Sequence, residues 1–205
     1  MIIIGHSNAG KSPLGQTLQQ RGFPPFRNCH HFDFGQNLRE IAGGTSSISL
    51  PKNDIDYIRS ILDGRLFDDA HQQLAISIIE QFLFSRSFNR KADLLILNGF
   101  PRHTGQAEIL QETGFAIRKI IWLNCPLPEA YTRKKLAEKG VGHEDRGNRG
   151  DSAHGIFRRK IISFERQTRP LLSYYQRKKI PVFRLPVCRN TTPEDMYRHL
   201  SRETI

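Results

Sequence analysis

The feature that most constrains this chain is a glycine loop set between an apolar strand and a helix. Residues 1–4 form a short run of β-branched and apolar side chains, which is typical of a parallel strand buried on both faces. The next eight residues, Gly5 to Ser12, read Gly-x-x-x-x-Gly-Lys-Ser, and a helix is predicted to follow and to end near Gly22. This order predicts an α/β fold with a central parallel sheet.

The loop itself has the composition of a phosphate-binding loop. Glycines let successive backbone N–H groups turn inward toward phosphate oxygens, and the following helix adds its positive end. Lys11 would supply a point charge to the terminal phosphates, and the Ser12 hydroxyl is a candidate magnesium ligand. The nucleotide-binding candidates are Gly5, Asn8, Ala9, Gly10, Lys11 and Ser12.

Further apolar runs and helical patterns alternate along the chain. Strands are predicted at about 28–32, 93–97, 117–123 and 180–185. Helices are predicted at about 36–42, 54–62, 69–88 and 156–176, with a last helix that begins after Thr192 as its N-cap. Parallel strands joined by helices bind ligands beyond their carboxyl ends, so the residues just after each strand are candidate site residues.

Charge points to an anionic partner without identifying it. The 205 residues, enough for one domain, carry a net charge of +11. Residues 131–205 hold 18 Lys and Arg against 8 Asp and Glu, whereas residues 1–130 hold 13 against 12. RNA, DNA, acidic lipid and a polyphosphate such as ATP all fit such an excess.

No apolar run reaches the roughly 18 residues that a membrane-spanning helix needs. The three cysteines, Cys29, Cys125 and Cys188, are odd in number and have no paired spacing. We therefore expect a soluble cytoplasmic protein with no membrane partner. Residues 139–153 are Gly-rich and charged, which predicts a surface loop.

A motif after the strand at 93–97 narrows the interpretation. It reads Asn98-Gly99-Phe100-Pro101-Arg102, and Gln106 follows four residues later. The chain resembles the adenylate kinase family of nucleoside monophosphate kinases, in which a strand ends in Asp-Gly-Phe-Pro-Arg. The resemblance implies a three-layer P-loop NTPase-type fold in a single domain. It also implies a helical nucleoside monophosphate (NMP) binding segment at about 34–65 and a short lid at about 138–153.

The same resemblance assigns the acceptor side. It implies that Arg102 holds the monophosphate and that Gln106 reads its base, with Gly99 beside them. Residues 34–39, Phe-Gly-Gln-Asn-Leu-Arg, are similar to the family's Thr-Gly-Asp-x-Leu-Arg. Residues 64–67, Gly-Arg-Leu-Phe, look like the family's Gly-Lys-Leu-Val stretch, which lines the base of the monophosphate. The acceptor-binding candidates implied by these matches are Phe34, Gly35, Arg39, Phe67, Gly99, Arg102 and Gln106.

Some positions depart from the family pattern. Asn98 stands where the family has an aspartate that helps to hold magnesium, and a neutral amide is a weaker ligand. Gln36 replaces a second acidic residue. Phe34 replaces a threonine, so it either stacks on the acceptor base or fills the pocket.

The last third adds candidate phosphate-binding cations. The segment from Arg149 through Lys160 to Thr168-Arg169-Pro170-Leu171 is similar to the family's lid and the helix that follows it. The resemblance implies catalytic roles for Arg149 and Lys160, while Arg133 and Lys139 are candidates for two further cationic positions. The lid has no cysteine, which excludes a four-cysteine zinc site there.

The implied activity is transfer of the terminal phosphoryl group of Mg-ATP to AMP or a related NMP, by a monomer. Lys11, Arg102, Arg149, Lys160 and Lys139 would be catalytic, and Ser12 and Asn98 would hold magnesium. One alternative is a weak nucleotide switch or ATPase that binds RNA or a protein through the basic C-terminal third. Another is a P-loop kinase for a different small acceptor.

Overall fold

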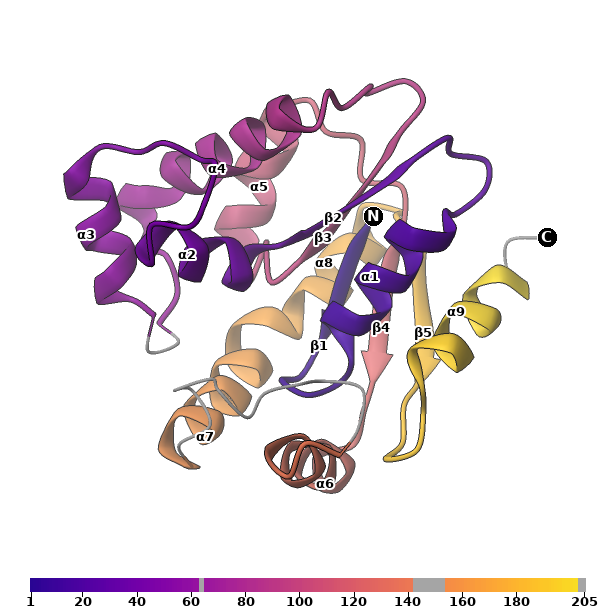
Figure 1. Ribbon diagram of the computed structural model, residues 1–205. Helices are drawn as coiled ribbons and strands as arrows, with labels where there is room; N and C mark the ends of the chain where they lie inside the picture. Colours follow the sequence, from indigo (N-terminus) through magenta and orange to yellow (C-terminus); the bar gives the residue numbers. More distant parts are fainter. Residues whose placement is uncertain (63–64, 142–153, 203–205) are drawn as a thin grey trace.

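The computed structural model describes residues 1–62, 65–141 and 154–202 and contains one sheet of five parallel strands (Figure 1). The strand order is β2-β3-β1-β4-β5, and helices lie on both sides, as the predicted α/β class requires. The strands are β1 Ile2–Gly5, β2 Cys29–Asp33, β3 Leu94–Asn98, β4 Ile120–Asn124 and β5 Val182–Pro186. The helices are α1 Lys11–Arg21, α2 Phe34–Ala42, α3 Lys52–Ser60, α4 Gln72–Ser85, α5 Thr104–Glu112, α6 Leu127–Glu138, α7 His154–Ser163, α8 Pro170–Arg177 and α9 Pro193–Arg202.

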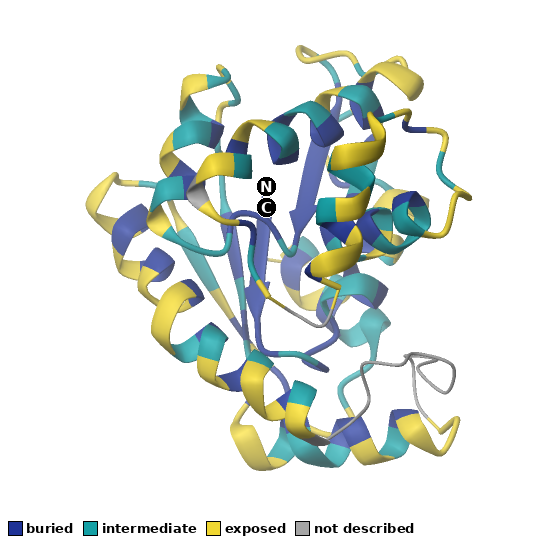
Figure 2. Ribbon diagram, turned by 90° about the vertical axis from the view of Figure 1, so that its left-hand side faces the viewer, coloured by how far each residue is buried: buried dark blue, intermediate teal, exposed yellow. Residues whose placement is uncertain are grey.

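Alternation along the strands divides the core into two layers. Ile2 and Ile4 pack with α4, α5 and α8, whereas Ile3 packs with α1 and α9 on the other face. Successive strand residues point to opposite faces, so a continuously apolar strand can fill both layers. Figure 2 shows the result, with buried strands between helices that are exposed on their outer sides.

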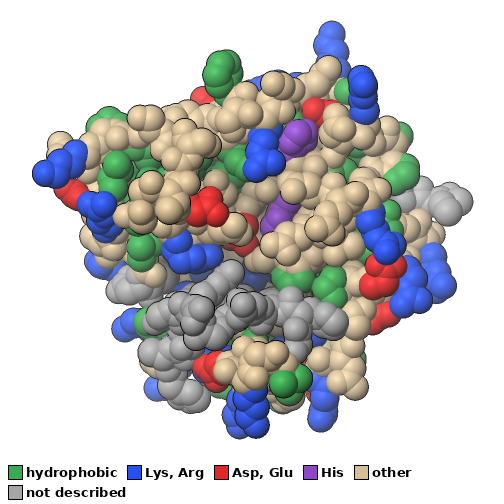
Figure 3. Space-filling model, in the orientation of Figure 1, with side chains coloured by type: hydrophobic (Ala, Val, Ile, Leu, Met, Phe, Trp, Pro, Cys, Tyr) green, Lys and Arg blue, Asp and Glu red, His purple; other side chains and the backbone are tan. Residues whose placement is uncertain are grey.

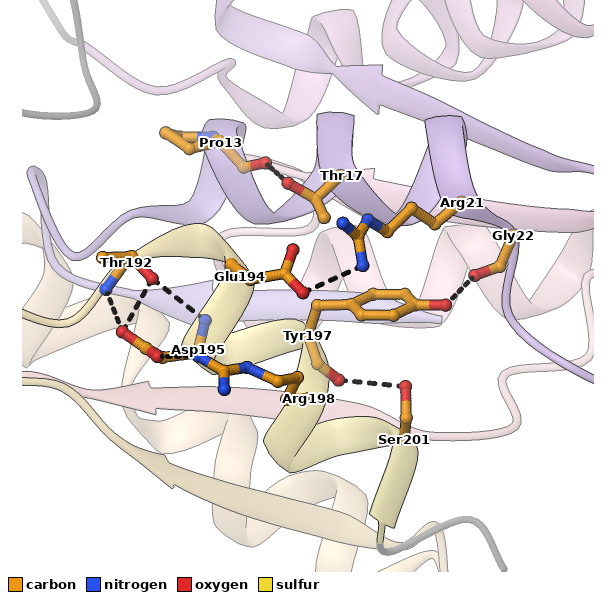
Figure 4. Close-up of polar contacts among 10 residues, drawn as sticks. All are labelled: Pro13, Thr17, Arg21, Gly22, Thr192, Glu194, Asp195, Tyr197, Arg198 and Ser201. Atoms are coloured by element: carbon orange, nitrogen blue, oxygen red, sulfur yellow. Dashed lines mark hydrogen bonds and ion pairs between the residues drawn. The ribbon is translucent and has the colours of Figure 1, made fainter.

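Polar contacts join the first and last helices over one face of the sheet (Figure 4). Arg21 pairs with Glu194 at 2.9 Å, and the Tyr197 hydroxyl donates to the Gly22 carbonyl. The N-terminus of α9 carries the predicted cap, because the Asp195 N–H donates to Thr192 Oγ1 at 3.0 Å and the Thr192 N–H donates back to the Asp195 carboxylate at 3.0 Å. The sequence signal for this helix start is confirmed.

The helical pattern predicted for residues 156–176 is interrupted in the structure. Between α7 and α8 lies a π-helical stretch, η3, Phe164–Thr168, whose widened turn is closed by the Arg169 N–H donating to the Phe164 carbonyl at 2.8 Å. Pro170 follows directly and has no N–H to donate, so it fits the first turn of a new helix better than the interior of a long one. In the same way, the helix predicted from residue 69 begins with the 3₁₀ turn η1, Asp69–His71, ahead of α4.

The topology fixes where a ligand can bind. Strand β1 lies between β3 and β4. The strands that follow β1 along the chain therefore lie on both sides of it in the sheet, which makes β1 a switch point of the topology. Ligands of open α/β sheets bind beyond the carboxyl ends of the strands at such a switch point.

None of the helices described is long and apolar enough to cross a membrane. Most of the predicted lid, residues 142–153, lies outside the described residues.

A buried carboxylate joins the opposite, amino-terminal ends of β2 and β3. Asp93 accepts from the Asn89 N–H at 2.9 Å and from Asn28 Nδ2 at 2.8 Å, and its carboxylate lies 3.3 Å from His30 Nε2. Burial by itself raises the pKa of Asp93, but these hydrogen bonds and the neighbouring His30 outweigh it and lower the pKa below its usual value. Ionised Asp93 therefore stabilises the fold.

We expect Phe32→Ala to lower the free energy of unfolding by about 3–5 kcal/mol, because the Phe32 side chain is 0% exposed and leaves a cavity. Phe84→Ala is the matched control, since Phe84 is 89% exposed and should change stability by less than about 0.5 kcal/mol. Urea unfolding followed by circular dichroism measures both. Equal losses would contradict the burial described here.

Asp93→Asn should lower the free energy of unfolding at pH 7 by about 1–2 kcal/mol, because an amide cannot accept all of these hydrogen bonds. The native pKa of Asp93 lies below its unfolded value of about 3.9, so the stabilisation is present above that pH and is lost as pH falls through the native pKa. The gap between wild type and variant should therefore close below about pH 4. Urea titrations from pH 7 to pH 3 measure it, with the exposed Asp56→Asn as control; a gap independent of pH would contradict the assignment.

Candidate active site

A cavity opens at the carboxyl ends of β1, β2 and β3 and extends toward α2 and η3. It brings together most of the predicted site residues, although they come from segments far apart in the chain. Those that line it are Gly5, Lys11, Ser12, Phe34, Gly35, Arg39, Phe67, Asn98, Gly99, Arg102, Gln106 and Lys160. Five cations, the four predicted residues Lys11, Arg39, Arg102 and Lys160 together with Arg65, therefore share one cavity with one carboxylate, Asp33.

Five predicted residues, Arg133 among them, do not line this cavity, and a sixth lies outside the described residues. Asn8, Ala9 and Gly10 are buried in the loop itself, and Lys139 is exposed at the end of α6. Arg149 lies outside the described residues.

Across the face seen in Figure 3, the Lys and Arg side chains are spread out with acidic side chains among them.

The glycine loop is held in shape by Lys11 and by close packing at Gly10. The Lys11 ammonium donates to the Gly5 and His6 carbonyls at 2.9 and 2.7 Å. Gly10 has a φ of +94°, and a Cβ there would lie 2.9 Å from the Met196 side chain. The backbone conformation therefore favours glycine at this position, and a Cβ would also displace the Met196 methyl group.

Arg133 supports the loop from behind. Its guanidinium donates to the Asn8 carbonyl at 2.8 Å and to the Cys188 and Thr191 carbonyls at 3.0 and 2.9 Å. The side chain is buried, and these bonds join the glycine loop to the segment between β5 and α9. Arg133 therefore positions the glycine loop, although its own side chain does not line the cavity.

The floor of the cavity carries a hydroxyl, a carboxylate and an amide in mutual contact. The Ser12 hydroxyl donates a short hydrogen bond to Asp33 Oδ2. Asn98 Nδ2 donates to the same carboxylate oxygen at 2.8 Å and to Ser12 Oγ at 3.1 Å. The sheet register explains the meeting, because Asp33 and Asn98 are paired residues at the ends of neighbouring strands β2 and β3.

Asp33 was not among the predicted site residues. It ends β2 and caps α2, where its Oδ1 accepts from the Gln36 N–H at 3.0 Å. Burial by itself raises the pKa of this carboxyl, but the Ser12 and Gln36 hydrogen bonds and the nearby charges of His31 and Arg39 lower it below the usual value. Its position directly after a strand was the available sequence signal.

Two hydrogen bonds fix the backbone of Arg102, and both partners lie in segments that match the family pattern. The Arg102 N–H donates to Gln106 Oε1 at 2.7 Å, and the Thr168 hydroxyl donates to the Arg102 carbonyl at 2.9 Å. Burial lowers the pKa of the Arg102 guanidinium to about 10, so it remains charged at neutral pH. Within the described part of the chain no carboxylate pairs with it. Arg102 is a partly buried cation at the cavity wall.

Aromatic side chains fill the wall nearest α2. Phe34 is 5% exposed, and its ring centroid lies 5.2 Å from those of Phe67 and Phe100. Phe34 therefore packs mainly into the core while one part of it borders the cavity. The sequence left two roles open for Phe34, stacking on the acceptor base or filling the pocket. Most of its contacts are those of a side chain that fills the pocket.

A further contact missed by the sequence analysis links the glycine loop to η3. His6 Nε2 lies 2.9 Å from the Glu165 carboxylate, and the His6 ring packs on Phe164 with centroids 4.1 Å apart. Burial lowers the pKa of His6, and Lys11 and Arg169 lower it further, although Glu165 opposes them. The loop is thus attached to the same stretch that holds Arg102.

Comparisons with known proteins agree with this geometry. No protein-family model matches the chain. It is 30% identical over 183 residues to Adenylate kinase 1 of Synechocystis sp., a match that covers 86% of this chain and 82% of that protein. A relative of this similarity over most of both chains, together with the five-stranded parallel sheet and its glycine loop, establishes the family: the chain belongs to the adenylate kinases.

Proposed function

We propose that this protein transfers the terminal phosphoryl group of Mg-ATP to AMP or a closely related nucleoside monophosphate. The observation that carries the proposal is Arg102, a partly buried cation with no carboxylate partner among the described residues, on the wall of the cavity that also contains Lys11. A partly buried cation without a carboxylate partner is suited to an anionic ligand. The relative's name, an adenylate kinase, makes AMP the first acceptor to test.

The residues divide between two phosphates. Lys11 and the glycine loop would bind the β- and γ-phosphates of ATP, while Arg102 and Arg39 would hold the phosphate of the acceptor. Lys160 approaches from α7 and would neutralise charge between them. Catalysis would consist of holding two polyanions in line, which is the main requirement for phosphoryl transfer.

The step needs no protein base. An oxygen of the acceptor phosphate forms a bond to the γ-phosphorus as the bond from that phosphorus to the bridging oxygen of ADP breaks. The acceptor oxygen is already anionic at neutral pH, so no proton has to be removed. Two nucleoside diphosphates result.

The cavity floor fits a magnesium ion that is bound together with nucleotide phosphates. Asn98 Oδ1 is buried and accepts no hydrogen bond from any described residue, and a hydroxyl and a carboxylate lie beside it. The hydroxyl and the carboxylate are hard oxygen donors of the kind magnesium prefers. No group of three His, Cys, Asp or Glu side chains in the described part of the chain could hold a metal by itself. When bound, magnesium would neutralise charge on the β- and γ-phosphates.

We expect ADP formation from Mg-ATP to depend on an added monophosphate, tested with AMP, CMP, UMP, GMP and no acceptor. Lys11→Ala and Arg102→Ala should each lower turnover by about 100-fold or more, because each removes a cation from a developing negative charge. Arg166→Ala is the matched control, since Arg166 is exposed and does not line the cavity. ADP release that is independent of the acceptor, or absent despite ATP binding, would contradict the kinase and favour a nucleotide switch or ATPase.

Phe34→Leu should raise KM for the monophosphate by about 3- to 10-fold while KM for ATP changes by less than about 2-fold, because the ring borders the α2 side of the cavity. Initial rates with each substrate varied in turn measure both constants, and the exposed Phe84→Leu serves as control. An equal change in the two KM values would contradict a specific place for Phe34 on the acceptor side.

A further inference from the structure

The hydrogen bonds on the cavity floor assign different roles to Asp33 and Asn98 from those expected from the sequence. Asn98 offers its amide nitrogen, not its oxygen, to Ser12 and Asp33. To present Oδ1 to the same place, the amide would have to turn and lose both hydrogen bonds. Asn98 is therefore bound as a donor that orients its neighbours.

The lone pairs of Ser12 lead to the same conclusion. A hydroxyl has one proton to donate and two lone pairs to accept with. The Ser12 proton goes to Asp33 Oδ2, and one lone pair accepts from Asn98 Nδ2. One lone pair of Ser12 remains for a cation, and Asp33 and Asn98 together fix the orientation of the hydroxyl.

The cavity contains little other negative charge. Asp33 is the single Asp or Glu among the described residues that line the cavity, which it shares with five cations, Lys11, Arg39, Arg65, Arg102 and Lys160. It is buried, and its carboxylate is fixed by α2 on one oxygen and by Ser12 and Asn98 on the other. Magnesium in nucleotide sites is bound through one or two carboxylates plus the substrate phosphates.

We propose that Asp33 supplies the protein carboxylate of the magnesium–nucleotide site, acting with the Ser12 hydroxyl, and that Asn98 is a positioning residue. The acidic group at this edge of the sheet would thus lie at the end of β2 and its amide partner at the paired position on β3. This inference rests on the proposed nucleotide-binding function of the same cavity.

The test measures how much magnesium tightens the binding of ADP. Isothermal titration calorimetry gives the dissociation constant of ADP with excess magnesium and with EDTA, and the ratio of the two constants is compared among variants. Asp33→Asn should lower this ratio by about 10- to 100-fold, while magnesium-free ADP binding is retained or tightened because a negative charge near the phosphates is removed. Asn98→Ala should lower the ratio less, by about 3-fold.

Controls separate a metal role from a structural one. Asp56→Asn removes an exposed carboxylate of α3 and should leave the ratio unchanged. Asn is as good an N-cap as Asp, so Asp33→Asn retains the start of α2. Asp33→Ser, which also keeps a capping oxygen, gives a second measurement if the amide variant does not fold.

The outcomes are distinct. An unchanged ratio in folded Asp33→Asn or Asp33→Ser, or a larger loss in Asn98→Ala than in either, would overturn the assignment to Asp33 while leaving the nucleotide site intact. Failure of the wild-type protein to bind ADP in either condition would overturn the proposed function and this inference together.

Discussion

The register between neighbouring parallel strands is the constraint on which the cavity depends. Asp33 pairs with Asn98 across β2 and β3, and Ile3 of β1 pairs with the same Asn98. β2 and β3 therefore end at the same level, and β1 continues past that level to Gly5, where the glycine loop begins. A slip of one residue would turn Asp33 away from Ser12 and move Phe32, which is wholly buried, out of its core layer to the opposite face of the sheet. The core and the polar floor of the cavity thus require the same register.

Much of the architecture could be predicted from local patterns, because buried parallel strands have continuous apolar runs and the glycine loop has a distinctive spacing. The five strands, the loop and the capped last helix lie where these patterns indicated, within a few residues. The break at η3 was less visible, since the apolar period continues through Phe164 and Pro170 was compatible with a single bent helix. Helices α5 and α6 were not predicted.

The site was only partly predictable, for a physical reason. Motif positions such as Lys11, Arg102 and Gln106 are recognisable by their spacing along the chain. The contacts of Asp33 with Ser12 and Asn98 depend on strand order, and those of Arg133 with the glycine loop join segments more than 100 residues apart. Side-chain direction also mattered: Asn98 lies where a ligand was expected, but its amide nitrogen is the atom that contacts Ser12.

The π-helical stretch has a mechanical consequence. At one end, Phe164 and Glu165 contact His6 of the glycine loop, and at the other, Thr168 bonds to the Arg102 carbonyl. The five consecutive residues of η3 thus contact both the glycine loop and the backbone of Arg102. A displacement of η3 would therefore move the glycine loop and Arg102 together, so one short piece of backbone links the two sides of the cavity.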